Sequence, residues 1–163
     1  MNGFVPGRTA GGTPQLTFAE HKSWENYLAT VLRMTSVLNR QLTDTHKLSL
    51  SDVHLLDLLD KSPDGSAQMS ALAEALRSLP SRLTRQVRRL EGQGLVERAI
   101  SPHDRRRVIV TITEAGRTLT EEAMTTYANE VRTHFLGPLT RPQIAAMATS
   151  CRQIGDGLKQ IQS

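Results

Sequence analysis

Residues 79–98 read LPSRLTRQVRRLEGQGLVER, and the apolar positions of this segment recur about once per helical turn. Four apolar side chains share one arc of about 80° when the segment is wound at 3.6 residues per turn: Leu79, Leu83, Val87 and Leu90. Such an arc predicts a helix that packs one side against a core. Pro80 suits the first turn of a helix, and Gly94 suits a left-handed stop. We therefore expect a helix from about Leu79 to Gln93, with Ser78 as its cap.

The side of this predicted helix away from the apolar arc is basic. It carries six side chains that can bind phosphates or base edges: Ser81, Arg82, Thr84, Arg85, Arg88 and Arg89. Glu91 is the only acidic residue of the predicted helix, whereas a helix that is merely soluble usually mixes both charge signs. Arginines held together repel one another, and DNA phosphates would remove that repulsion.

The positive charge of the chain is concentrated around this helix. Between Arg77 and Arg107 there are nine arginines and three acidic residues, whereas the formal net charge of the whole chain is +4. This segment therefore has an excess of six positive charges, and the rest of the chain has a net charge of −2. Such an excess favours nucleic acid as a partner, although a solvated arginine-rich surface has the same composition.

The neighbouring segments predict a helix-turn-helix followed by a wing. A helix over about 51–61 ends at a Pro-Asp-Gly turn, and a short helix near 69–76 precedes the basic helix. Two segments rich in β-branched residues, 95–100 and 108–112, flank a polar loop and predict a hairpin. In a helix-turn-helix the second helix enters the major groove, where arginine can bind guanine and serine or threonine can bind a base or a phosphate. The hairpin tip has three arginines that suit a narrow minor groove: Arg105, Arg106 and Arg107.

Longer helices are predicted toward both ends of the chain. The first begins at Thr17, which has capping-box spacing to Glu20, and reaches about Thr45. A helix over about 114–135 and a last helix over about 140–161 follow the wing. The first and last helices each have a heptad seam of apolar residues, which can pack within one chain or between two chains.

Three segments resemble the multiple-antibiotic-resistance repressor (MarR) family. LTRQVRRLEGQGLVER (residues 83–98) is similar to the recognition helix and first wing strand of that family, and MSALA (69–73) to its third helix. DRRRVIVTITEAG (104–116) resembles the Asp-x-Arg wing and the Leu-Thr-x-x-Gly entry to the next helix, with Ile112 where leucine is usual. The resemblance is strongest over residues 50–117. It implies a mainly α fold with a small β-hairpin wing, a winged helix-turn-helix to which the terminal helices add a dimerisation lobe.

The resemblance also implies a function and residue roles. The chain is expected to be a homodimeric transcription regulator of double-stranded DNA, usually a repressor, whose palindromic site places two recognition helices one DNA turn apart. Side chains expected in the groove or on phosphates are Ser81, Thr84, Arg85 and Arg88. Arg106 is expected in the minor groove, and Asp104 is expected to orient the wing through an ion pair.

The domain organisation follows from these assignments. Residues 1–16, rich in glycine and proline, predict a mobile tail. Residues 17–48 and 114–163 are expected to form the dimerisation helices, and 49–113 the DNA-binding domain. Members of the family often release DNA when a small aromatic or phenolic molecule binds between these lobes. The candidates for such a pocket in this chain are Trp24, Tyr27, Arg33 and His46.

Several other classes of function lack support in the sequence. The chain has no phosphate loop, nucleophile elbow or dinucleotide fingerprint, so neither an enzyme nor a cofactor is expected. It has no long apolar segment and no recognisable secretory signal. Its one cysteine, Cys151, lies on the last seam, and a single cysteine cannot form an internal disulfide. A cytoplasmic protein is therefore expected. The five histidines show no ligand spacing, so no metal is expected. Two alternatives remain open: a winged-helix adaptor that binds proteins, and a metal-responsive regulator.

Overall fold

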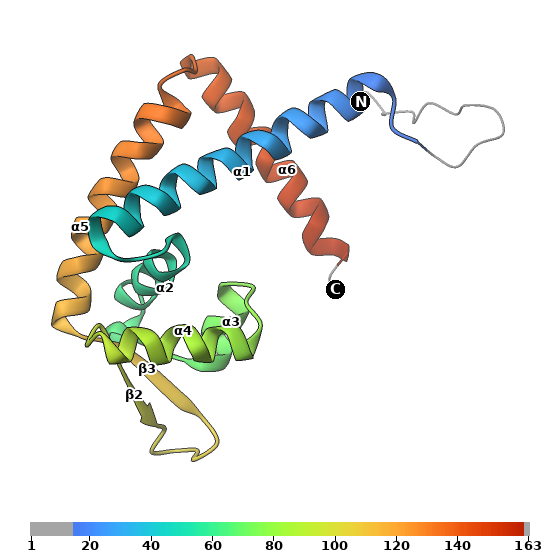
Figure 1. The fold of residues 1–163 in the computed structure, drawn as a ribbon. Helices are drawn as coiled ribbons and strands as arrows, with labels where there is room; N and C mark the ends of the chain where they lie inside the picture. Colours follow the sequence, from blue (N-terminus) through green and yellow to red (C-terminus); the bar gives the residue numbers. More distant parts are fainter. Residues whose placement is uncertain (1–14, 162–163) are drawn as a thin grey trace. The chain divides into compact units, whose positions relative to one another are not determined.

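The structure is a computed structural model that describes residues 15–161. Its elements follow one another in the order shown in Figure 1: α1 (Phe18–His46), α2 (Leu50–Asp60), the 3-10 turn η1 (Pro63–Gly65), β1 (Ser66–Gln68), α3 (Met69–Ala75), α4 (Pro80–Gly92), β2 (Val96–Ile100), β3 (Val108–Ile112), α5 (Glu114–Glu130), the π-helical segment η2 (Val131–Leu136) and α6 (Arg141–Ile161). The predicted fold class, mainly α with a β-hairpin wing, is confirmed. Among the described residues, no helix is both long and apolar enough to cross a membrane.

The chain divides after Ser36 into two compact units. The described part of the first unit, residues 15–36, is the beginning of α1. The predicted capping box is present there, because the backbone N–H of Thr17 donates to Glu20 Oε2 at 2.7 Å and the N–H of Glu20 donates to Thr17 Oγ1 at 3.3 Å. The predicted tail lies almost entirely outside the described residues.

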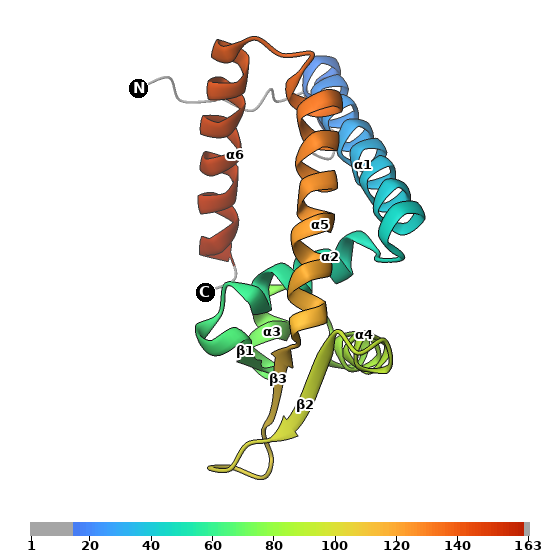
Figure 2. The same ribbon diagram turned by 90° about the vertical axis from the view of Figure 1, so that its left-hand side faces the viewer.

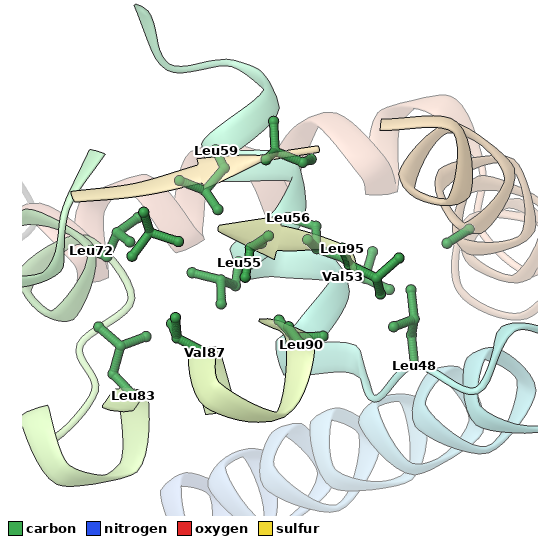
Figure 3. Close-up of a cluster of buried hydrophobic side chains, with 14 of the residues drawn as sticks. Leu48, Val53, Leu55, Leu56, Leu59, Leu72, Leu83, Val87, Leu90 and Leu95 are labelled. Atoms are coloured by element: carbon green, nitrogen blue, oxygen red, sulfur yellow. The ribbon is translucent and has the colours of Figure 1, made fainter. Parts of the chain in front are cut away.

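The second unit has a closed hydrophobic core. Val53, Leu55 and Leu56 of α2 lie near Val87 and Leu90 of α4, and all belong to one buried cluster that also includes residues of the sheet (Figure 3). Three of the four predicted core positions of α4 are fully buried: Leu83, Val87 and Leu90. Full burial of one such side chain contributes about 1.5–3 kcal/mol, so this stripe fixes α4 firmly to α2.

Leu79, the fourth predicted core position, is exposed, and its assignment to the core was wrong. The helix begins at Pro80, and Leu79 is the residue before it, with φ −63° and ψ 137°. A residue that precedes proline is driven out of the helical region by the proline ring, so Leu79 leaves the helical arc. Its side chain is 72% exposed. Ser78 likewise does not cap the helix, because Leu79 is the residue in the N-cap position.

The sheet has three antiparallel strands in the order β1-β3-β2. The predicted hairpin is confirmed as β2 and β3, which pair from Val96 opposite Ile112 to Ile100 opposite Val108. Strand β1 was not predicted, because three residues are too few to show an alternating pattern. The hairpin extends past α4 on the side away from α5, as a wing does (Figure 2).

The wing is joined closely to the start of α5. Thr113 caps α5 as predicted, accepting from the N–H of Gly116 at 3.0 Å, and its own N–H donates to the carbonyl of Leu95 at 3.0 Å. A Cβ atom at Gly116 would lie 2.2 Å from that same carbonyl oxygen. Only glycine therefore lets α5 approach the strand so closely.

Helix α6 is the least buried element of the second unit. It meets α5 at the turn around Gly137 and then diverges from it (Figure 1). None of its residues is buried, and its apolar seam includes Ile154 and Leu158, which are 59% and 56% exposed. The heptad seam predicted here therefore exists as an apolar face without a cover in the single chain.

Candidate nucleic-acid interface

The exposed side of α4 carries the predicted arginines. Ser81, Arg82, Arg85 and Arg88 are all exposed, whereas Thr84 is half-buried and donates its hydroxyl to the carbonyl of Pro80 at 2.8 Å. This side lies opposite the stripe that packs on α2. The side chains predicted to face a duplex thus point into solvent rather than toward the core.

Five arginines of α4 and the wing form no ion pair among the described residues, although Arg88 is near enough to Glu91 to help lower the pKa of that carboxyl group. Among residues 15–161, no carboxylate lies within ion-pair distance of these side chains: Arg82, Arg85, Arg88, Arg105 and Arg106. We call these residues the arginine surface. Unpaired cations that share one side of a protein produce a positive potential that attracts a polyanion.

Arg89 differs from these five because it has a partner on another helix. Its guanidinium Nη2 donates to Asp52 Oδ1, and Gln86 Nε2 donates to the same oxygen at 3.0 Å. Asp52 is fully buried at the start of α2, where its other oxygen accepts from the N–H of Ser49 at 2.8 Å. Arg89 is 47% exposed, so the DNA contact predicted for it would compete with this ion pair.

The charge of Asp52 is stabilised in this position. Burial alone would raise the pKa of its carboxyl group, but the hydrogen bonds from Ser49, Gln86 and Arg89 more than offset that effect. The pKa of Asp52 is therefore lower than its ordinary value, and the group stays ionised at neutral pH. The ionised carboxylate joins α4 to the start of α2, which fixes the direction in which the arginine surface faces.

A second ion pair joins the same last turn of α4 to the wing. Arg98 on β2 donates to Glu91 Oε2 from Nε at 2.8 Å and from Nη2 at 2.7 Å. These hydrogen bonds are the main reason why the pKa of Glu91 is lower than usual. The last turn of α4 is thus held by two ion pairs, from Arg89 to Asp52 at the start of α2 and from Glu91 to Arg98 on the strand.

Asp104 makes contacts with two other residues of the wing tip. Its Oδ1 accepts from the backbone N–H of Arg106 at 3.0 Å, and its Oδ2 accepts from Arg107 Nε at 3.0 Å. Arg107 also donates to Gln68 Oε1 at 3.3 Å, which connects the loop to β1. The turn therefore uses Arg107 for its own structure and leaves the exposed Arg105 and Arg106 for a ligand.

Two cavities lie on the two flanks of α4. The first, of about 540 Å³, is lined by residues of α2, the α3–α4 connection and α4: Ser51, His54, Leu76, Arg77, Ser78, Arg82, Arg85, Gln86 and Arg89. The second, of about 550 Å³, extends from α3 and α4 to the wing: Gln68, Met69, Ser70, Ala73, Pro80, Leu83, Thr84, Arg88, Arg98, Arg106, Arg107 and Val108. Both cavities share arginines with the arginine surface.

The residues predicted to hold an effector line neither of these cavities. Trp24, Tyr27 and Arg33 are exposed on the first part of α1, with the two aromatic ring centroids 6.0 Å apart. His46, in the second unit, has its Nε2 2.7 Å from Thr126 Oγ1. The effector site at these four residues stays a prediction.

Within residues 15–161, no three His, Cys, Asp or Glu side chains come close enough together to hold a metal ion. Cys151 is exposed on α6.

Some functional residues were missed in the sequence. Asp52 had a detectable signal, because Ser49 and Asp52 have capping-box spacing and do form that cap. The pairing of Asp52 with Arg89 and of Arg107 with Gln68 joins residues 37 and 39 positions apart, and no local pattern indicates such contacts.

Known proteins resemble this chain in sequence and in fold. The model of the MarR family matches residues 48–108. The HTH-type transcriptional repressor NicR of Pseudomonas putida is 30% identical over 124 residues, which are 76% of each chain. The structure of AbsC, a MarR family transcriptional regulator of Streptomyces coelicolor, is 28% identical, with a TM-score of 0.84 over 91% of this chain and 99% of AbsC.

A further relative has been determined with its ligand. Sco3205 of Streptomyces coelicolor, solved in complex with DNA, is 28% identical, with a TM-score of 0.83 over 88% of this chain and 94% of Sco3205. The matches cover the helix-turn-helix, the wing and the flanking helices, and these proteins are described as transcriptional regulators or repressors. The chain belongs to the MarR family of DNA-binding transcriptional regulators.

Proposed function

We propose that this chain is a homodimeric repressor that reads a palindromic duplex with α4 and the wing. The observation that carries the proposal is the arginine surface, five exposed guanidinium groups without a carboxylate partner among the described residues. Arg85 and Arg88 lie opposite the buried stripe and enter the major groove. Each guanidinium that binds guanine through two hydrogen bonds contributes about 1–3 kcal/mol of discrimination.

The rigidity of α4 supports this proposal. Asp52 and Arg98 anchor the last turn of the helix and the buried stripe anchors one side of it, so little ordering is left to occur when DNA binds. Arg106 follows a turn that Asp104 closes, and it enters the minor groove beside the site that α4 reads. Arg105 contributes a phosphate contact.

The uncovered face of α6 supports the homodimer. Ile154, Leu158 and Ile161 form an exposed apolar stripe, and exposed apolar patches mark interaction surfaces. A second copy of the chain covers this stripe and places a second α4 about 34–36 Å from the first, which matches one turn of DNA. The duplex is then a palindrome, because the dimer has two-fold symmetry.

We further propose that a small molecule releases the protein from DNA. The two cavities beside α4 have volumes typical of small-molecule sites, and arginines line both. A small aromatic carboxylate or phenolate held by Arg82 and Arg85, or by Arg88 and Arg106, would compete with DNA for the same side chains. Repression as the direction of control is supported by the relative NicR, which is named as a repressor.

The test is DNA binding by the full chain. A duplex that contains the region upstream of its own gene, or one selected from a random pool, is titrated in a gel shift. Arg85→Ala should weaken binding about 10-fold or more and relax the base preference, as expected for the loss of one groove contact. The matched control is Arg141→Ala, which removes an exposed arginine outside the interface and should bind as the wild type does. A wild-type protein that binds no duplex even at low salt would be an adaptor, and the proposal would be wrong.

A further inference from the structure

Leu79 is an exposed apolar side chain next to the arginine surface. The DNA contacts proposed for the arginines do not explain why it is exposed. Between residues 37 and 160 no large apolar side chain is more exposed than the 72% of Leu79. Burying a leucine contributes about 1.5–3 kcal/mol, so folding gains little from this one. Its exposure follows from Pro80, which both starts α4 and keeps Leu79 out of the helical arc.

The surroundings of Leu79 are polar and basic. Its chain neighbours Ser78 and Pro80 line the first and the second cavity respectively, and each cavity also contains arginines of the exposed side of α4. An apolar protein partner or a lipid chain would leave these arginines buried without counter-ions, which is strongly unfavourable. The group that covers Leu79 must therefore be apolar and at the same time belong to a polyanion.

DNA offers one aliphatic group to the major groove, the C5-methyl group of thymine. The beginning of a recognition helix is the part that contacts base edges in a helix-turn-helix complex. Leu79 is the N-cap residue of α4, two positions before Ser81, and its extended backbone turns the side chain away from the buried stripe. The position of Leu79 at the start of α4, its exposure and its apolar side chain all fit a contact with this methyl group.

We propose that Leu79 is a specificity-determining residue that packs against a thymine methyl group in each half-site. The inference rests on the proposed DNA-binding function and extends it from hydrogen-bonding to apolar recognition. Arginine and serine side chains of α4 recognise donors and acceptors, whereas Leu79 recognises a methyl group, which no hydrogen-bonding side chain can distinguish from hydrogen.

The test replaces thymine by uracil, which removes the methyl group and leaves the base-pairing edge and the O4 acceptor intact. A duplex is first selected from a random pool with the wild-type protein, and each thymine pair related by the two-fold axis is then replaced in turn. Binding is measured by fluorescence anisotropy for the wild type, Leu79→Ala and Leu79→Met. At one pair of positions we expect uracil to weaken wild-type binding about fourfold per half-site, the effect of one buried methyl group.

The two variants then show whether Leu79 causes the preference for thymine over uracil. Leu79→Ala should bind thymine and uracil duplexes equally, whereas Leu79→Met, which keeps an apolar side chain, should retain part of the preference. Both variants should melt at the wild-type temperature, because Leu79 is exposed, and both should bind an unrelated duplex as the wild type does.

Two results overturn this inference while leaving the proposed function intact. One is a wild-type protein that binds its selected duplex but is indifferent to uracil at every position. The other is a Leu79→Ala variant that remains as sensitive to uracil as the wild type. Absence of any arginine-dependent binding to DNA by the wild type would instead overturn both the inference and the proposed function.

Discussion

Helices α4 and α6 have the same kind of apolar periodicity and opposite burial. On α4 the stripe Leu83, Val87 and Leu90 is fully buried against α2, whereas on α6 Ile154 and Leu158 are more than half exposed. Periodicity predicts that one side of a helix is apolar but does not say what covers it. The difference separates a lobe whose apolar stripe is buried from a helix whose apolar stripe is exposed, which is why we propose that a second chain covers α6.

The polar contacts show the same contrast. Helix α4 is held by ion pairs to other elements, through Asp52 and Arg98. The ion pair on α6 between Lys159 and Asp156 is local, three residues apart on one exposed surface, and local surface pairs contribute only about 0–1 kcal/mol. Stability is therefore expected to depend on the winged-helix lobe, and association on α6.

The largest expected effect compares two glycines. Gly116→Val should lower the free energy of unfolding by about 4 kcal/mol, because its Cβ would overlap the Leu95 carbonyl and force the wing away from α5. Gly157→Ala on α6 meets nothing within 4 Å and should be neutral or stabilising by about 0.5–1 kcal/mol. Urea unfolding monitored by circular dichroism measures both. Equal effects of the two substitutions on the free energy of unfolding would contradict the view that the wing–α5 junction is tightly packed and α6 is not.

The second comparison concerns two leucines. Leu55→Ala opens a hole in the core and should lower the free energy of unfolding by about 3 kcal/mol, whatever the protein concentration. Leu158→Ala should instead weaken association, so its melting temperature should fall below that of the wild type at a concentration where the wild type is associated, and should depend less steeply on concentration. Sedimentation equilibrium gives the dimer constant directly. A Leu158→Ala protein that associates like the wild type would contradict the role of α6.

Asp52 gives a smaller effect with a distinctive pH dependence. Asp52→Asn should lower stability by about 1–3 kcal/mol at neutral pH, discounted because Arg89 is half exposed. The pKa of Asp52 is below its unfolded value near 3.8, so its contribution is fully present above that value and is lost as the pH falls through the lower folded pKa. Urea unfolding from pH 7 to below pH 4 should show the variant and the wild type converging at the acid end. A difference in the free energy of unfolding that stays the same at every pH would mean that the charge of Asp52 does not cause the stabilisation.

The smallest expected effect is at the wing. Arg106→Ala should leave stability unchanged and weaken DNA binding by about 1 kcal/mol or slightly more, because the side chain is exposed and makes no ion pair among the described residues. Arg107→Ala removes the partner of Asp104 and should weaken binding by loosening the turn as well. Isothermal titration with one duplex compares the two variants. A lower melting temperature of the Arg106→Ala protein than of the wild type would contradict the view that Arg106 contributes to DNA binding and not to stability.

The sequence predicts local features of this fold well and distant contacts poorly. The buried stripe of α4, the hairpin and the Thr17 and Thr113 caps were all predicted from spacing within a few residues. The stripe failed at Leu79, because Pro80 dominates the geometry of the residue before it. The contact of Arg89 with Asp52 could not be predicted, because it depends on how α2 and α4 pack.

The most direct test of the arginine surface is the salt dependence of DNA binding. The dissociation constant of a selected duplex is measured by anisotropy at several salt concentrations, for the wild type and for Arg85→Ala/Arg88→Ala. Four cationic side chains are lost in the dimer, so the slope of log K against log salt should become shallower, by up to about 3 to 4, the value for four lost phosphate contacts. A variant with the slope and affinity of the wild type would show that DNA binds elsewhere on the protein.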